Sequence, residues 1–148
     1  MATVESDKIR NIGVVGHGDA GKTSLVSTLL FASGDVNRLG KVEEGNTVTD
    51  YDEEEIERQV TLTSSIAHSR WKDHKINLVD TPGYSAFVQD AKMTLLGVDT
   101  ALVVVDAVEG IEVQTEQVCE FANDLGLARA FVLTKMDKPR ADFQSAID

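Results

Sequence analysis

One short segment near the N-terminus constrains the fold of this chain more than any other. Its eight residues are Gly16, His17, Gly18, Asp19, Ala20, Gly21, Lys22 and Thr23. They match the phosphate-binding pattern G-x-x-x-x-G-K-[ST] in full. An apolar, partly β-branched run at 9–15 precedes the segment, and 24–32 follows it with apolar residues at helical spacing. Strand, glycine loop and helix therefore stand in the order that a phosphate-binding loop requires.

A loop of this kind binds phosphate mainly through its backbone. Its glycines let successive N–H groups turn inward, and the N-terminus of the following helix adds its positive end. Lys22, as a loop lysine facing solvent, would reach the β- and γ-phosphates, and the Thr23 hydroxyl would ligate Mg²⁺. Ser24 completes the binding segment, and we expect His17 to be structural rather than catalytic. The sequence therefore predicts a nucleoside phosphate as the ligand.

The composition is that of one globular domain without a membrane segment. Of its 148 residues, 42% are hydrophobic and 26% are charged. Apolar runs such as 101–105 are too short to span a bilayer, and the polar N-terminus shows no signal peptide. The net charge of −11 argues against a direct grip on nucleic acid. We expect a cytoplasmic, monomeric domain, and the acidic run 50–57 is typical of a solvated face or mobile loop.

Strand-like and helix-like segments alternate along the chain. The predicted strands are 9–15, 65–71, 75–79, 100–105 and 129–133. The predicted helices are 24–32, 85–96, 112–125 and one beginning at 140, while 33–63 is typical of a long functional or mobile loop. This alternation predicts an α/β fold with a mostly parallel open sheet and helices on both faces. In such sheets the ligand lies at the carboxyl ends of the strands.

A second motif follows the predicted strand 75–79. Its residues are Asp80, Thr81, Pro82, Gly83 and Tyr84. An acidic residue at a strand tip beside the phosphate loop can hold Mg²⁺ through water, and Gly83 can bring its N–H close to a γ-phosphate. A turn with Pro and Gly is common between a strand and a helix. After a phosphate loop, however, the functional interpretation is favoured.

Two further segments complete the predicted site. Thr134, Lys135, Met136 and Asp137 follow the strand 129–133. The Asp137 carboxylate can accept hydrogen bonds from the N1–H and the amine of guanine, a pair that adenine lacks, and the Lys135 stem can lie across the base. Thr61, at the end of the long loop, can complete the Mg²⁺ shell when a γ-phosphate is present. Such loops are ordered by nucleotide and released on hydrolysis.

In this order, the motifs resemble the GTP-binding domain of translational GTPases, most closely elongation factor G and its paralogues. The shared residues are 16–23, Arg58 to Thr61, Asp80 to Gly83, Lys135 to Asp137 and Arg140 to Phe143. The resemblance covers nearly the whole chain. It implies a P-loop NTPase fold, GTP and GDP as ligands, Mg²⁺, and a parent protein that hydrolyses GTP on the ribosome during elongation. It also implies a switch I at about 34–63, a switch II at about 80–97, and Lys22, Thr61, Gly83 and Tyr84 as candidate catalytic residues.

The chain departs from the family's pattern at four positions. Tyr84 stands where the family has the His that positions the attacking water, and we expect its ring to turn away until a partner orders the loop. Gly18 replaces an aliphatic residue, Gln59 a glycine and Thr134 an asparagine. Because a phenol orients water less well than an imidazole, we expect hydrolysis to be slow.

The loop that closes over guanine in this family, usually Ser-Ala followed by Lys or Leu, is missing. Ser145-Ala146 comes too soon after Asp137 to serve as that loop. We therefore expect residues 1–148 to be the N-terminal part of a GTP-binding domain, without its last strand and helix and without downstream domains. Two alternatives stay open: a ribosome-protection or release-factor GTPase, and a nucleotide-binding switch that hydrolyses slowly.

Overall fold

Five strands form one open sheet in the computed structural model, which describes residues 4–146. The strands are β1 (Ile9–Val15), β2 (Ser65–Trp71), β3 (His74–Asp80), β4 (Thr100–Asp106) and β5 (Ala128–Thr134). Their order across the sheet is β2-β3-β1-β4-β5. β2 pairs antiparallel with β3, and the other pairs are parallel. The predicted mostly parallel open sheet is confirmed.

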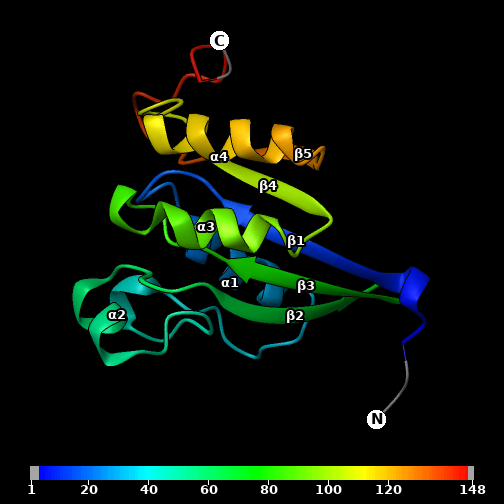
Figure 1. The fold of residues 1–148 in the computed structure, drawn as a ribbon. Coiled ribbons are helices and arrows are strands. Elements are labelled where there is room, and N and C mark those ends of the chain that lie inside the picture. Colours follow the sequence, from blue (N-terminus) through cyan, green and yellow to red (C-terminus); the bar gives the residue numbers. More distant parts are fainter. Residues whose placement is uncertain (1–3, 147–148) are drawn as a thin grey trace.

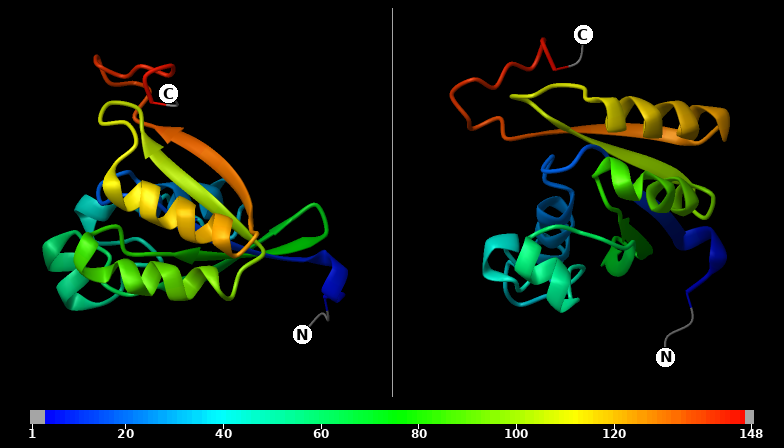
Figure 2. Two further views of the ribbon diagram at one scale, coloured as in Figure 1. Left: turned by 45° about the horizontal axis from the view of Figure 1, so that its top comes forward. Right: turned by 60° about the vertical axis from the view of Figure 1, so that its left-hand side comes forward.

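Helices cover both faces of the sheet, as predicted. α1 (Lys22–Ala32) packs on one face, and α3 (Val88–Leu95) and α4 (Val113–Asp124) pack on the other (Figure 1). The two further views in Figure 2 show the same layers. The remaining helical pieces are α2 (Glu53–Arg58) and the 3₁₀ turns Ser6–Lys8, Val42–Glu44 and Ser85–Phe87. Within residues 4–146, no helix has the length and apolar character needed to cross a bilayer.

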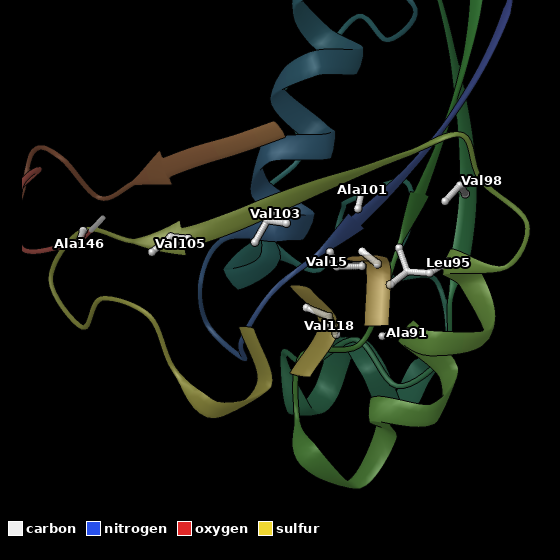
Figure 3. Close-up of a cluster of buried hydrophobic side chains, with 10 residues drawn as sticks. Val15, Ala91, Leu95, Val98, Ala101, Val103, Val105, Val118 and Ala146 are labelled. Atoms are coloured by element: carbon white, nitrogen blue, oxygen red, sulfur yellow. The ribbon is translucent and has the colours of Figure 1, made fainter. Parts of the chain in front are cut away.

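The hydrophobic core consists of two clusters, one on each side of the sheet. Because successive side chains of a strand point to opposite faces, Val14 joins the cluster with Leu30 of α1, while Val15 joins the other cluster (Figure 3). Leu95 of α3 and Val118 of α4 complete that second cluster. All five side chains are at most 2% exposed. Burying an aliphatic side chain of this size stabilises the fold by roughly 1.5–3 kcal/mol, so the strand ends that carry the loops are held firmly.

Two predicted segments differ from the structure. Residues 33–63 are not irregular throughout, because α2 and the turn Val42–Glu44 lie within them. The helix predicted to begin at 140 is, in the described part of the chain, only a turn at 143–146. The Ala146 N–H closes this turn on the Asp142 carbonyl, at 3.1 Å. Residues 147 and 148, which also fall in that predicted helix, lie outside the described residues.

The acidic run 50–57 also differs from the sequence-based prediction. It was expected to be a solvated face or a mobile loop, but part of it is buried. Asp52 caps α2 by accepting a hydrogen bond from the Glu54 N–H at 2.9 Å. The Glu55 side chain, 1% exposed, accepts hydrogen bonds from the N–H groups of Leu62 (2.9 Å) and Thr63 (3.2 Å). An acidic cap three residues before a glutamate is the sequence signal for this helix start. The buried carboxylate thus ties α2 to the segment that leads into β2.

Glu55→Ala should make this segment open more easily, because it leaves the amides of Leu62 and Thr63 without acceptors. We expect the free energy of opening, measured by hydrogen exchange at these two amides, to fall by about 1–3 kcal/mol. Glu57→Ala, on the exposed side of the same helix, should leave both amides unchanged. Equal protection in Glu55→Ala and the wild type would contradict this role for Glu55.

Candidate nucleotide-binding site

The phosphate-binding loop connects β1 to α1 and rests against the neighbouring strand β4. Gly16 has φ 144°, and a Cβ at this position would overlap the Val104 carbonyl oxygen. Gly21 has φ 89° at the N-cap of α1, a conformation that also favours glycine. Both glycines are therefore required by backbone geometry. They bring the loop to the carboxyl end of the parallel strands, where the sheet topology places a ligand.

Lys22 is buried rather than facing solvent, which corrects the sequence-based expectation. Its side chain is 6% exposed, and its Nζ donates a hydrogen bond to the His17 carbonyl at 2.7 Å. Burial lowers the pKa of the ammonium to about 8, against the attraction of Asp80, Asp19 and Asp50. The ammonium group of Lys22 is therefore a compact, partly desolvated positive charge next to the phosphate loop. Such a charge suits the binding of phosphate.

Two hydroxyls from distant segments meet at the start of α1. The Oγ1 atoms of Thr23 and Thr61 are 3.0 Å apart. Thr61 donates its hydroxyl hydrogen to Asp50 Oδ1 at 2.8 Å, so Thr23 is left as the donor between the two threonines. Both residues were predicted as Mg²⁺ ligands, and the structure brings them together.

Asp80, the third predicted metal-site residue, is fully buried at the end of β3. Its Oδ2 accepts a hydrogen bond from the Thr49 hydroxyl at 2.8 Å, while its Oδ1 has no hydrogen-bond partner. Burial raises the pKa of this carboxyl to about 6, partly offset by the hydrogen bond from Thr49. An unpartnered buried carboxylate oxygen is costly, so its position beside the phosphate loop favours a polar or cationic ligand there.

Sequence reasoning missed Asp50 and Thr49, which hold the predicted Mg²⁺ residues in place. Asp50 is 4% exposed, and burial raises the pKa of its carboxyl. Both residues lie in the 33–63 segment, directly before the acidic helix α2. Their polar side chains look like ordinary surface residues in the sequence, because only the approach of this segment to β3 and α1 buries them.

The turn after β3 lies against the phosphate loop. A Cβ at Gly83 would collide with Lys22 Nζ and lie 2.6 Å from the Gly18 nitrogen. The Tyr84 hydroxyl donates to Asp19 Oδ2 at 2.8 Å, and the ring lies over Gly18. The ring therefore rests on the phosphate loop, which corrects the expectation that it turns away. The hydrogen bond to Asp19 raises the pKa of the phenol.

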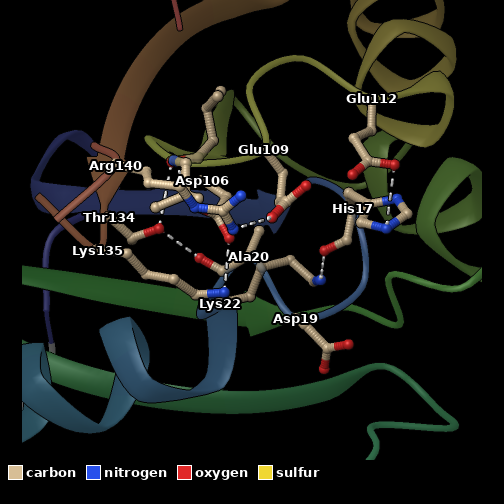
Figure 4. A network of polar contacts seen from close by, with 12 residues as sticks. His17, Asp19, Ala20, Lys22, Asp106, Glu109, Glu112, Thr134, Lys135 and Arg140 are labelled. Carbon is tan, nitrogen blue, oxygen red and sulfur yellow. Dashed lines mark hydrogen bonds and ion pairs between the residues drawn. The ribbon is translucent and has the colours of Figure 1, made fainter. Parts of the chain in front are cut away.

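The predicted base-binding segment is joined to the phosphate loop by Thr134. Its hydroxyl lies 2.7 Å from the Ala20 carbonyl oxygen (Figure 4). The same hydroxyl lies 3.2 Å from the Val105 carbonyl oxygen. Threonine at this position therefore keeps a link to the loop. Lys135 Nζ forms an ion pair with Asp106 Oδ2 at 2.6 Å, which helps to hold the pKa of that carboxyl below its usual value despite partial burial.

His17 is tied to the start of α4. Its Nε2 lies 3.4 Å from Glu112 Oε2 (Figure 4). Its Nδ1 lies 2.5 Å from Gln114 Oε1, and its backbone N–H donates to the Thr115 hydroxyl at 3.2 Å. These contacts attach the phosphate loop to the first residues of α4 and to Glu112, which precedes it.

A cavity of about 330 Å³ lies among these elements. The predicted residues that line it are Gly18, Asp19, Gly21, Lys22, Thr23, Ser24, Thr61, Gly83, Tyr84 and Lys135. An adjoining cavity of about 500 Å³ shares Gly18, Asp19 and Lys135 and continues past His17 to Lys138. Gly16, Ala20, Asp80, Thr81 and Pro82 are buried behind this surface. Met136 and Asp137 are exposed and line neither of these two cavities.

Strand, glycine loop and helix in this geometry define a P-loop domain. The model of the elongation factor Tu GTP binding domain family matches residues 7–148, and the chain belongs to this family. It is 45% identical over 142 residues to ribosome-releasing factor 2, mitochondrial, from Drosophila melanogaster, covering 96% of this chain and 19% of that protein. It is 39% identical over 148 residues to elongation factor G from Granulibacter bethesdensis, covering 100% of this chain and 21% of that protein.

Solved structures agree with this assignment. The crystal structure of a Thermus thermophilus protein superposes with a TM-score of 0.90 at 39% identity, covering 95% of this chain and 21% of that one. A bacterial selenocysteine-specific elongation factor gives a TM-score of 0.74 at 27% identity, covering 95% and 22% respectively. The chain thus spans about a fifth of the length of the relatives that it matches.

The buried Asp80 should make the metal-free, nucleotide-free protein less stable as the pH rises. Its folded pKa of about 6 lies above the usual 3.8, so the folded state holds an extra proton between these values. The contribution of Asp80 to the free energy of unfolding should therefore fall by roughly 2 kcal/mol as the pH rises from 4 to 7.

Urea denaturation of the wild type and Asp80→Asn at pH 4 and pH 7 measures this difference. The variant should lose less stability than the wild type over the same interval, because its amide does not titrate. The same loss in both proteins would show that Asp80 is charged in the folded state throughout this range.

Proposed function

We propose that this chain is the GTP-binding and GTP-hydrolysing switch domain of an elongation factor G-like protein that acts on the ribosome during translation elongation. The pairing of the Thr23 and Thr61 hydroxyls, 3.0 Å apart, is the observation that carries this proposal. It joins the phosphate loop to the 33–63 segment at the point where a nucleotide-bound Mg²⁺ would lie. A segment held through a metal and a γ-phosphate is released when that phosphate leaves, which is how a switch I segment works.

Three groups of residues would each bind a different part of GTP or GDP. Residues 16–24 surround the phosphates, residues 80–84 close the γ-phosphate end, and residues 134–137 hold the guanine. The cavity that extends from Lys22 to Lys135 supports this division, because Lys135 belongs to the 134–137 segment and lines the same cavity as the phosphate loop. Switch I would occupy about 34–63 and switch II about 80–97.

The residues present fit a Mg²⁺ ion. Among residues 4–146, no cluster of three or more His, Cys, Asp or Glu side chains has metal-binding geometry. A nucleotide-bound Mg²⁺ needs no such cluster, because phosphate oxygens, hydroxyls and waters supply its ligands. Thr23 and Thr61 would ligate the ion directly, and the unpartnered Asp80 Oδ1 would accept a hydrogen bond from a metal-bound water. When bound, the ion neutralises charge that develops on the phosphates.

Hydrolysis in this proposal depends on charge stabilisation and on the orientation of water. Lys22 and the Gly83 N–H would stabilise negative charge on the γ-phosphate, and their close approach supports a shared role. Tyr84 would position the attacking water. A phenol has no imidazolium form at neutral pH, so we propose a slow reaction.

The partner of the parent protein would be the ribosome, and we propose that the domain is monomeric, cytoplasmic and without a direct grip on nucleic acid. The net charge of −11 supports the last point. A release-type function is the second candidate, because a relative at 45% identity is named a ribosome-releasing factor. That relative is also named as mitochondrial, so the mitochondrion is the alternative location.

Guanine selectivity should depend on Asp137. We expect the parent protein to bind GTP more tightly than ATP, and Asp137→Asn should weaken GTP binding at least about tenfold while favouring xanthosine triphosphate. Competitive titration with the three nucleotides measures both effects. Asp124→Asn, an exposed residue at the end of α4, is the matched control. Equal affinities of the wild type for GTP and ATP would refute the assignment of the base site.

Tyr84→His should speed GTP hydrolysis, because an imidazole orients water better than a phenol. Acid–base groups contribute roughly a hundred- to ten-thousandfold to such rates, and we expect a gain of at least about tenfold. Single-turnover hydrolysis at saturating ribosomes measures it, with Tyr51→His at an exposed tyrosine as the control. A wild-type rate equal to that of ordinary elongation factor G, with no gain from histidine, would show that another group positions the water.

A further inference from the structure

Tyr84 contacts two consecutive residues of the phosphate loop. Its ring lies so close over Gly18 that a Cβ at that position would stand 3.0 Å from the ring Cζ and 3.1 Å from each Cε. Its hydroxyl donates a hydrogen bond to Asp19 Oδ2 at 2.8 Å. Gly18, Asp19 and Tyr84 therefore form one unit that joins the start of the 80–97 segment to the loop.

The close approach explains why glycine occupies position 18. A Cβ rarely lies as near to a ring carbon as it would here, so even alanine would push the ring away from the loop. Gly83, the residue before the tyrosine, is itself packed against the Gly18 nitrogen. The backbone that carries the ring therefore has little room to adjust. The glycine at 18 and the tyrosine at 84 depend on each other.

The hydrogen bond to Asp19 determines whether the Tyr84 hydroxyl acts as a donor or an acceptor toward a water molecule. A tyrosine hydroxyl has one hydrogen and can also accept hydrogen bonds through its lone pairs. Because the hydrogen is given to Asp19, the oxygen of Tyr84 is left as an acceptor. Tyr84 lines the same cavity as Lys22 and Thr61. An attacking water must keep a lone pair toward phosphorus, so an acceptor for its hydrogens is the group that orients it.

We propose that Asp19 is a positioning residue for the hydrolysis proposed above. Asp19 accepts the hydroxyl hydrogen of Tyr84, whose ring lies over Gly18. The phenol oxygen is thereby left to accept a hydrogen bond from the attacking water. In this step the water oxygen bonds to the γ-phosphorus and the bond to the β–γ bridging oxygen breaks. GDP leaves with the bridging oxygen, and the proton of the water goes to a γ-phosphate oxygen. The inference rests on the proposed GTPase function and adds Gly18 and Asp19 to its machinery.

A double-mutant cycle in the protein that carries this chain tests the pair. Single-turnover hydrolysis is measured at saturating GTP and ribosomes. Tyr84→Phe removes the hydroxyl and Asp19→Ala removes its acceptor, so each should lower the rate about tenfold. The double variant should be no slower than either single variant, because both remove the same interaction. Asp19→Asn keeps an acceptor oxygen and should recover most of the lost rate. Asp124→Ala, at an exposed carboxylate at the end of α4, is the matched control.

A spectroscopic measurement tests the contact without hydrolysis. In protein labelled at the tyrosine ¹³Cζ, the Tyr84 signal is identified by its loss in Tyr84→Phe. This signal should shift in Asp19→Ala, which removes the hydrogen bond, and in Gly18→Ala, which crowds the ring. It should stay in place in Tyr51→Phe.

The outcomes separate the two proposals. A shifted signal together with a non-additive loss of rate supports Asp19 as a positioning residue. An unshifted signal overturns the role of Asp19. A shifted signal with an unchanged rate and faster GDP release also overturns it, and shows that the contact only holds the phosphate loop and the 80–97 segment together. A wild type that does not hydrolyse GTP at all, even with ribosomes, overturns the proposed function, and the positioning role falls with it.

Discussion

The arrangement of the site depends on one buried positive charge, the ammonium group of Lys22. A charge removed from water needs compensating partners, and three carboxylates from different segments attract this one. Asp80 ends β3, Asp19 belongs to the phosphate loop, and Asp50 comes from the 33–63 segment. The lysine therefore draws together the parts of the chain that a triphosphate would touch. The pKa of Lys22 is lowered to about 8, because the effect of burial exceeds the attraction of the three carboxylates.

The two sides of the site differ in how firmly they are held. The phosphate loop is fixed by the sheet and its two hydrophobic clusters. The 33–63 segment is attached through the hydroxyls of Thr49 and Thr61, which donate to buried carboxylates. Hydrogen bonds of this kind contribute only about 1.5–3 kcal/mol each, so a change at the nucleotide is large enough to compete with them. A phosphate loop fixed by the core, beside a segment that meets the site through hydrogen bonds, is a combination that suits a switch.

The departures from the family's pattern change the chemistry of the site more than its framework. Thr134 still reaches the Ala20 carbonyl at 2.7 Å, so the strand that precedes the base site stays connected to the phosphate loop. Gly18 and Tyr84 fit each other as a pair, with the ring filling the space where an aliphatic side chain would stand. At these positions, the Tyr84 hydroxyl donates to Asp19 and the Thr134 hydroxyl lies within hydrogen-bonding distance of the Ala20 carbonyl, so both side chains contact the phosphate loop.

The sequence by itself determined the α/β fold, the strands and the residues of the phosphate loop, because these follow from local spacing: apolar periodicity, glycine positions and the order of motifs. It also contained the capping signal of α2 at Asp52. Only the tertiary structure decided that Lys22 is buried, that Thr23 meets Thr61, and that Tyr84 lies on the loop. These contacts join residues 38 and 65 positions apart. They depend on which strands become neighbours in the sheet and on how closely the loops at its carboxyl edge pack, and no local pattern encodes that.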